Sequence, residues 1–257
     1  MPLAQTRNGP IWYADHRDPT LHRPTAILIH GAGGTHLDWP AELRRMPEAS
    51  AIVVDLPGHG RSPGPGRQSV AAYADDVFAL MDSLKIGRAI LGGHSMGGAI
   101  ALTMALSMPE RARGLLLVGT GAKLAVHPDI LNGILTELGK TIGLLIGWYY
   151  SPSATEQMRR RTQQALSSVT PQTLYGDYAA VNQFDVRDQL NHVQVPTLIV
   201  GSTADQLTPF KFSEYLHEHI AGSQVVKVEG AGHMLPIEQP EAVAEAVLKW
   251  LLAREWS

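Results

Sequence analysis

The chain has 257 residues, and 44% of them are hydrophobic, which is enough apolar material to bury a sizeable core. Its 21 basic and 24 acidic residues leave a formal net charge of -3, so charge gives no reason to expect a nucleic acid or a membrane surface as partner. Cysteine is absent, which excludes disulfides and thiol catalysis; with an N-terminal stretch that lacks the apolar segment of a signal peptide, this favours a cytoplasmic location.

Short apolar runs alternate along the chain with segments of helical pattern. Residues 1–18 are polar and broken by proline, and we expect the first strands there. Buried strands are predicted for six further runs: 26–29, 51–54, 89–91, 115–118, 197–200 and 224–228. Helices are predicted for five segments: 37–45, 70–84, 95–108, 210–220 and 240–253. The alternation predicts an α/β fold with a mostly parallel central sheet and helices on both faces.

A glycine-rich loop follows the predicted strand 26–29 and reads His-Gly-Ala-Gly-Gly over 30–34. Its glycines do not have the Gly-x-Gly-x-x-Gly spacing of a dinucleotide site, and no Gly-Lys-Ser/Thr indicates a phosphate loop. Trp39 comes shortly after this loop. It is a candidate for the rim of a substrate pocket, and packing of the first helix explains it equally well.

The segment 91–98 reads Leu-Gly-Gly-His-Ser-Met-Gly-Gly and places Ser95 at the centre of Gly-x-Ser-x-Gly, between a predicted strand and a predicted helix. This pattern is typical of the nucleophile elbow, a strained turn that exposes a serine hydroxyl. Gly93 and Gly97 lack the side chains that would collide across so tight a turn. The following helix aims its free N–H groups at the reaction centre, where negative charge develops. Ser95 is therefore the predicted nucleophile.

A serine hydroxyl requires a general base, and the base requires an acid to orient it. Two later loops supply these residue types. Asp205 follows the predicted strand 197–200, and His233 follows the predicted strand 224–228. Positions just past the carboxyl ends of parallel strands meet at one edge of a sheet, so we expect both side chains to lie near Ser95.

On these motifs the chain resembles the α/β-hydrolase superfamily, in its group of small cap-bearing serine esterases. The order serine, aspartate, histidine along the chain is the one that family has. Two further segments extend the resemblance. Residues 27–34 are similar to the family's strand and His-Gly loop, and residues 54–62 are similar to its Asp-x-x-Gly-x-Gly-x-Ser turn. The resemblance implies that the α/β-hydrolase fold covers nearly the whole chain.

The resemblance also implies an oxyanion hole made of two backbone N–H groups. One belongs to Met96, the residue after the nucleophile. The other comes from the His-Gly loop, with Ala32 as first choice and Gly33 as second. His59 and His94 lie inside motifs and are expected to support turns rather than to react.

Residues 121–191 carry no convincing strand and are predicted to form several helices. By resemblance this stretch is the helical cap insertion, and residues 1–120 and 192–257 form the hydrolase core. Three aspartates of the cap are weaker candidates for the triad acid: Asp177, Asp185 and Asp188.

The cap is expected to select the substrate, because its segment 129–150 is unusually apolar. Leu138, Leu145 and Trp148 are candidates to line a substrate pocket, although packing of cap on core explains any one of them more simply. An apolar lid over a serine nucleophile favours a hydrophobic acyl or aromatic group beneath it.

The predicted function is hydrolysis of a small-molecule carboxylic ester through an acyl-enzyme, without a cofactor, a metal or a membrane span. His217 and His219 lie two apart on a predicted helix and face different directions, which argues against a metal pair. Other reactions of the family stay open: lactone, thioester and carbon–carbon hydrolysis and perhydrolysis. A slow-turnover ligand receptor also stays open. The oligomeric state also stays open, since the apolar cap stretch could equally be a dimer interface.

Overall fold

The computed structural model describes residues 3–18, 20, 23–46 and 48–256. Eight strands form one sheet in the order β1-β2-β4-β3-β5-β6-β7-β8. Their bounds are β1 Leu3–Thr6, β2 Gly9–Asp15, β3 Thr25–Ile29, β4 Ser50–Val54, β5 Ala89–His94, β6 Ala112–Val118, β7 Thr197–Ser202 and β8 Gln224–Val228. β1 and β2 pair antiparallel to their neighbours, and all the other pairs are parallel. The predicted mostly parallel sheet is confirmed.

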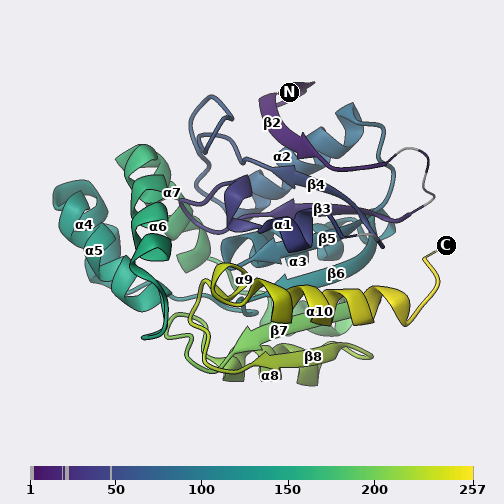
Figure 1. Cartoon of the computed structure of the whole chain (residues 1–257). Coiled ribbons are helices and arrows are strands. Elements are labelled where there is room, and N and C mark those ends of the chain that lie inside the picture. The colour runs from purple at the N-terminus through teal and green to yellow at the C-terminus, as the bar shows by residue number, and fades with distance from the viewer. Residues whose placement is uncertain (1–2, 19, 21–22, 47, 257) are drawn as a thin grey trace.

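The central strands are mostly apolar because helices cover both faces of the sheet. In β3, Ile27 pairs with Ile52 of β4 on one side and with Leu91 of β5 on the other. Alternate residues point to opposite faces, so Ile27 belongs to one buried cluster and Leu28 to the other. α2 (Val70–Ser83), α3 (Met96–Ser107) and α8 (Phe210–His219) cover the first face, and α1 (Ala41–Arg44) and α10 (Pro240–Leu252) the second (Figure 1).

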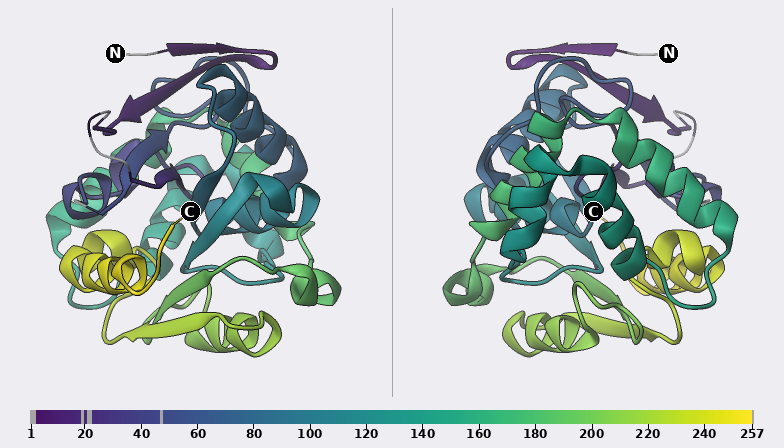
Figure 2. Two further views of the ribbon diagram at one scale, coloured as in Figure 1. Left: turned by 90° about the vertical axis from the view of Figure 1, so that its right-hand side faces the viewer. Right: turned by 90° about the vertical axis from the view of Figure 1, so that its left-hand side faces the viewer.

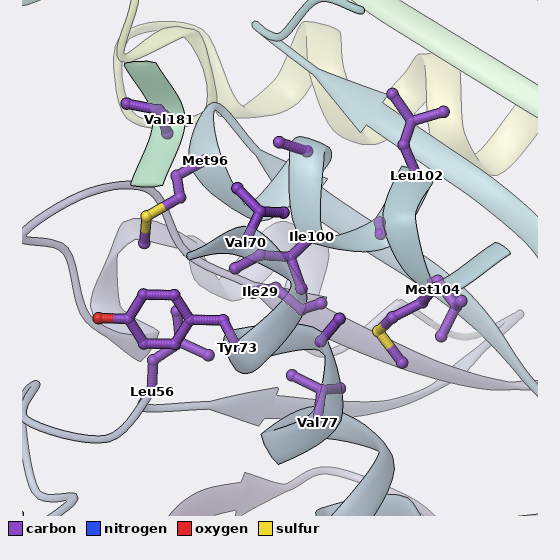
Figure 3. Close-up of a cluster of buried hydrophobic side chains, with 14 of the residues drawn as sticks. Ile29, Leu56, Val70, Tyr73, Val77, Met96, Ile100, Leu102, Met104 and Val181 are labelled. Atoms are coloured by element: carbon purple, nitrogen blue, oxygen red, sulfur yellow. The ribbon is translucent and has the colours of Figure 1, made fainter. Parts of the chain in front are cut away.

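The first cluster is the larger one and reaches from the sheet to the turn at Ser95. Figure 3 shows part of it, with Val70 and Tyr73 of α2 near Met96 and Ile100 of α3. Met96 is fully buried. Its side chain therefore fixes the start of α3 in the core, while its backbone stays at the turn beside Ser95.

One predicted helix is broken in the structure. The segment predicted as 37–45 forms a 3-10 turn, η1 (His36–Asp38), and then α1, with Pro40 between them. Proline lacks a backbone N–H, so it begins a helix more readily than it continues one. Trp39 lies at this break and is fully buried in the second cluster, on the face that α1 and α10 cover.

Four helices lie between β6 and β7 and form the layer that we call the helical insertion: α4 (Pro128–Thr136), α5 (Leu138–Tyr149), α6 (Glu156–Ser168) and α7 (Pro171–Asn182). They stand together to one side of the sheet in Figure 1 and face the viewer in the right panel of Figure 2. The division into a core and a cap at residues 121 and 191 stays a prediction.

The two ends of the helical insertion come together at a neck. There the Val186 amide donates to the carbonyl of Ala122, with N and O 2.9 Å apart. Lys123 and Asp185 form an isolated antiparallel bridge, and the Lys123 ammonium lies 3.3 Å from the Asp185 carboxylate. The chain thus leaves the sheet and returns to it at one place.

Within the described ranges, no helix has the length and apolar character needed to cross a bilayer.

Candidate active site

Ser95 occupies a turn of one residue between β5 and α3. Its backbone has φ 54° and ψ −118°, so α3 begins at Met96 rather than at Ser95. A non-glycine residue in such a conformation stores about 1–3 kcal/mol of strain, which the surrounding structure must hold. A Cβ at Gly93 would lie 2.0 Å from the Gly97 backbone, and one at Gly97 would lie 2.2 Å from the Ile29 oxygen. Both glycines are therefore required by close backbone contact.

The structure brings together Ser95, His233 and Asp205 in a hydrogen-bonded chain. His233 Nε2 lies 2.9 Å from Ser95 Oγ, and His233 Nδ1 lies 2.9 Å from Asp205 Oδ2. Asp205 comes from the loop after β7 and His233 from the loop after β8, and both side chains are buried. In this geometry His233 can take the proton of Ser95 while Asp205 holds the imidazole.

The loop after β7 prepares Asp205 to stay ionised. Asp205 Oδ1 accepts the amides of Leu207 and Thr208 at 2.8 and 2.9 Å, and Oδ2 accepts the Thr208 hydroxyl at 2.7 Å. Burial by itself would raise the pKa of Asp205. The charge of His233 and these donors outweigh burial and lower that pKa to about 2.

His94 supports the triad histidine from behind. Its Nε2–H donates to the His233 carbonyl oxygen at 2.8 Å, and the two ring centroids lie 4.9 Å apart. Burial lowers the pKa of His94 to about 3, so this ring is neutral and serves as a fixed donor.

The glycine-rich loop after β3 forms a tight turn beside Ser95. The Gly34 amide donates to the Gly31 carbonyl at 3.1 Å, and Gly33 has φ +65°. The Gly33 amide donates to Asp177 Oδ2 at 2.8 Å. In the part of the chain that the structure describes, the amides of Ala32 and Met96 donate to no other protein group. Of the two predicted candidates in this loop, Ala32 therefore has its N–H free for a substrate oxygen, and Gly33 does not.

A cavity of about 280 Å³ opens at Ser95 between the sheet and the helical insertion. Two of the predicted pocket residues, Leu145 and Trp148, lie in its wall. The other two do not. Leu138, the first residue of α5, packs against the first cluster, and Trp39 is buried on the opposite face of the sheet. Ile130, which belongs to the same apolar cap segment 129–150, also lies in the wall. Residues that the sequence did not single out complete it, among them Tyr149, Tyr178, Val181 and Leu207.

A second space of about 10 Å³ adjoins Ser95 and His233 on the side of the 31–34 loop. Asp38 and Thr162 are among its lining residues, and Ser95, His233 and Tyr149 line both spaces. Its size is roughly that needed for one water molecule.

The described residues contain no cluster of three or more histidine, cysteine, aspartate or glutamate side chains that could hold a metal ion.

Comparison with known proteins assigns the fold to a family. The family described as the alpha/beta hydrolase family matches residues 26–246. The chain is 32% identical over 232 residues to a pimeloyl-acyl-carrier protein methyl ester esterase of Neisseria meningitidis serogroup B, covering 84% of this chain and 88% of that protein.

Solved structures agree with this assignment. A hydrolase from Pseudomonas aeruginosa has a TM-score of 0.88 at 28% identity, covering 97% of both chains. A thermophilic esterase from Thermogutta terrifontis has a TM-score of 0.86 at 27% identity, covering 98% of both.

Proposed function

The chain belongs to the alpha/beta hydrolase family, and we propose that it hydrolyses carboxylic esters through an acyl-enzyme formed on Ser95. The observation that carries the proposal is the continuous hydrogen-bonded chain from Ser95 through His233 to Asp205, which opens into an apolar cavity. Such a chain activates a serine for attack on a carbonyl carbon.

Acylation follows from this arrangement. Ser95 Oγ attacks the ester carbonyl while His233 Nε2 accepts its proton, and Asp205 stabilises the imidazolium that forms. The carbonyl oxygen becomes an oxyanion, which the amides of Met96 and Ala32 bind. Loss of one such donor typically raises the barrier by about 3–4 kcal/mol. His233 then returns the proton to the departing alcohol, and the acyl group stays on Ser95.

Deacylation repeats these steps with water in place of the serine hydroxyl. The space of about 10 Å³ beside Ser95 and His233 suits this water, because it has the size of one molecule and polar atoms on its wall. His233 takes a proton from the water, and the acid is released as the Ser95 hydroxyl is restored.

The larger cavity supports a hydrophobic acyl or aromatic group as the part of the substrate under the helical insertion. Ile130, Leu145, Trp148 and Val181 supply apolar surface there. Its volume of about 280 Å³ lies just below the range of about 300–1,000 Å³ typical of ligand pockets. We therefore expect short and medium acyl chains to react faster than palmitoyl.

Steady-state hydrolysis of p-nitrophenyl esters from acetyl to palmitoyl tests the proposal, with Ser95→Ala assayed beside the parent. A methyl ester of a medium-length acid belongs in the series, because the Neisseria relative is named for a methyl ester. Multiple turnover that falls by up to about 10⁶-fold in Ser95→Ala supports a serine esterase. A rate that the mutant shares contradicts it, and a parent that stops after one equivalent points to a receptor.

A further inference from the structure

Asp177 of α7 joins the helical insertion to three separate segments of the core. This side chain is fully buried. Its Oδ2 accepts the Gly33 amide at 2.8 Å and His59 Nε2 at 2.7 Å, and its Oδ1 accepts the Tyr73 hydroxyl at 2.5 Å. The three donors come from the loop after β3, the loop after β4 and helix α2.

The surroundings of the His59 ring favour its positively charged form. Its Nδ1 faces the Pro57 carbonyl oxygen at 3.0 Å and its Nε2 faces the Asp177 carboxylate, and both of these groups only accept hydrogen bonds. Both ring nitrogens face acceptors, and this arrangement favours the imidazolium, in which both nitrogens donate. Burial alone would lower the pKa of His59, but the Asp177 charge outweighs burial and raises it. His59 and Asp177 thus form a buried ion pair.

The helical insertion also packs directly on the loop that Asp177 holds. With φ +65° at Gly33, an added Cβ would lie 2.5 Å from Leu166 of α6 and 2.7 Å from Leu174 of α7. Helices α6 and α7 therefore pack directly against the Gly33 peptide. The hydrogen bond from the Gly33 amide to Asp177 joins the same loop to α7.

We propose that Asp177 is a positioning residue for the oxyanion hole, an inference that rests on the ester hydrolysis proposed above. By holding the Gly33 amide, Asp177 fixes the peptide that follows Ala32 and so the direction of the Ala32 N–H. Its carboxylate takes no part in proton transfer, because its partner is His59 and not His233. A carboxylate this close to the loop would oppose an oxyanion, but the His59 charge neutralises it.

Asp177→Asn tests the proposal, because asparagine keeps the shape and loses the charge. One amide oxygen cannot accept hydrogen bonds from all three donors, and the asparagine NH₂ would place a donor against one of them. We expect kcat for a p-nitrophenyl ester to fall by about 10- to 100-fold, since small misplacements of catalytic groups have effects of that order, while KM stays within about threefold. The inhibition constant of an alkyl boronic acid, which forms a tetrahedral adduct on serine, should weaken by the same factor as kcat.

Asp76→Asn is the matched control. Asp76 is also a buried aspartate in an ion pair, with Arg67 at 2.7 Å, but it lies on α2 and does not contact the 31–34 loop. It should lose thermal stability and keep the parental kcat and boronate affinity. If both variants melt lower but only Asp177→Asn loses kcat, the effect belongs to the oxyanion loop and not to general loosening.

An Asp177→Asn variant with parental kcat and boronate affinity overturns the inference. If the parent itself neither hydrolyses esters nor binds the boronate, the proposed function has failed instead.

If Asp177→Asn does not fold, hydrogen exchange in the parent protein still tests the inference. The Gly33 amide should exchange with solvent deuterium at least about tenfold more slowly than the Ala32 amide, because only Gly33 is hydrogen-bonded. Equal exchange of the two amides overturns the inference.

Discussion

Replacing Asp205 by asparagine separates the charge of the triad acid from its shape. The two backbone donors from Leu207 and Thr208 both reach Oδ1, so they will hold the asparagine oxygen at that position. The asparagine NH₂ then takes the place of Oδ2 and faces His233 Nδ1. An N–H donor at this place requires that His233 Nδ1 be unprotonated, so the imidazole proton lies on Nε2. A protonated Nε2 cannot accept the proton of Ser95.

The magnitude follows from the lost charge and the wrong tautomer. Both side chains are buried, so an effective dielectric constant near 20 applies, and two charges about 4 Å apart then interact by about 4 kcal/mol. That energy corresponds to roughly 10³ in rate. The wrong tautomer adds about another factor of ten, so kcat/KM of Asp205→Asn should fall by about 10⁴.

Asp205→Ala gives the sharper comparison. In that variant the Thr208 hydroxyl, 3.2 Å from His233 Nδ1, can accept the Nδ1 proton and keep the correct tautomer. We therefore expect alanine to retain about tenfold more activity than asparagine, although it removes more atoms. Hydrolysis of one p-nitrophenyl ester at a fixed pH, with thermal melting as a check on folding, measures both. Equal rates, or a slower alanine variant, would refute the tautomer argument.

Three further predictions concern the pocket, the core and pH. Trp148→Ala should shift the preferred ester toward longer acyl chains because Trp148 lines the cavity, and Leu138→Ala should leave the chain-length profile unchanged; equal shifts would contradict this. Trp39→Ala should lower the free energy of unfolding by about 3–5 kcal/mol without changing that profile, as measured by urea denaturation and ester assays. The raised pKa of His59 contributes stability that is complete below about pH 6.5 and is lost as pH rises through the raised value. The difference in urea midpoint between the parent and His59→Gln should therefore shrink from pH 6 to pH 9, and a constant difference would count against the buried ion pair.

The parallel core could be predicted from sequence because the apolar pattern of each strand or helix lies within one short stretch of the chain. The strand predicted as 224–228 and the helix predicted as 70–84 match β8 and α2 to within one residue. In both elements the apolar pattern and the end signals lie within the segment itself. The turn at Ser95 is predicted from a local motif, although Gly97 is needed because the carbonyl of Ile29, far away in the sequence, lies against it.

The contacts of the helical insertion could not be predicted in this way. The sequence offers Asp177 only as a substitute for Asp205, whereas in the structure it lies against Gly33, 144 positions away in the chain. Trp39 and Leu138 fail as pocket residues for a similar reason. A helical pattern shows that a residue is apolar, and only tertiary packing decides which apolar surface it meets.

The neck of the helical insertion has an evolutionary consequence. Ala122 and Val186 are joined by a backbone hydrogen bond. The strands that flank the insertion, β6 and β7, pair through residues 115–118 and 197–200, which lie outside it. Recombination that replaced the segment between Ala122 and Val186 would therefore change the helices that line the cavity and leave the pairing of β6 with β7 as it is. Such a replacement would also remove the acceptor that Asp177 offers to the Gly33 amide, unless the new segment supplied another one there.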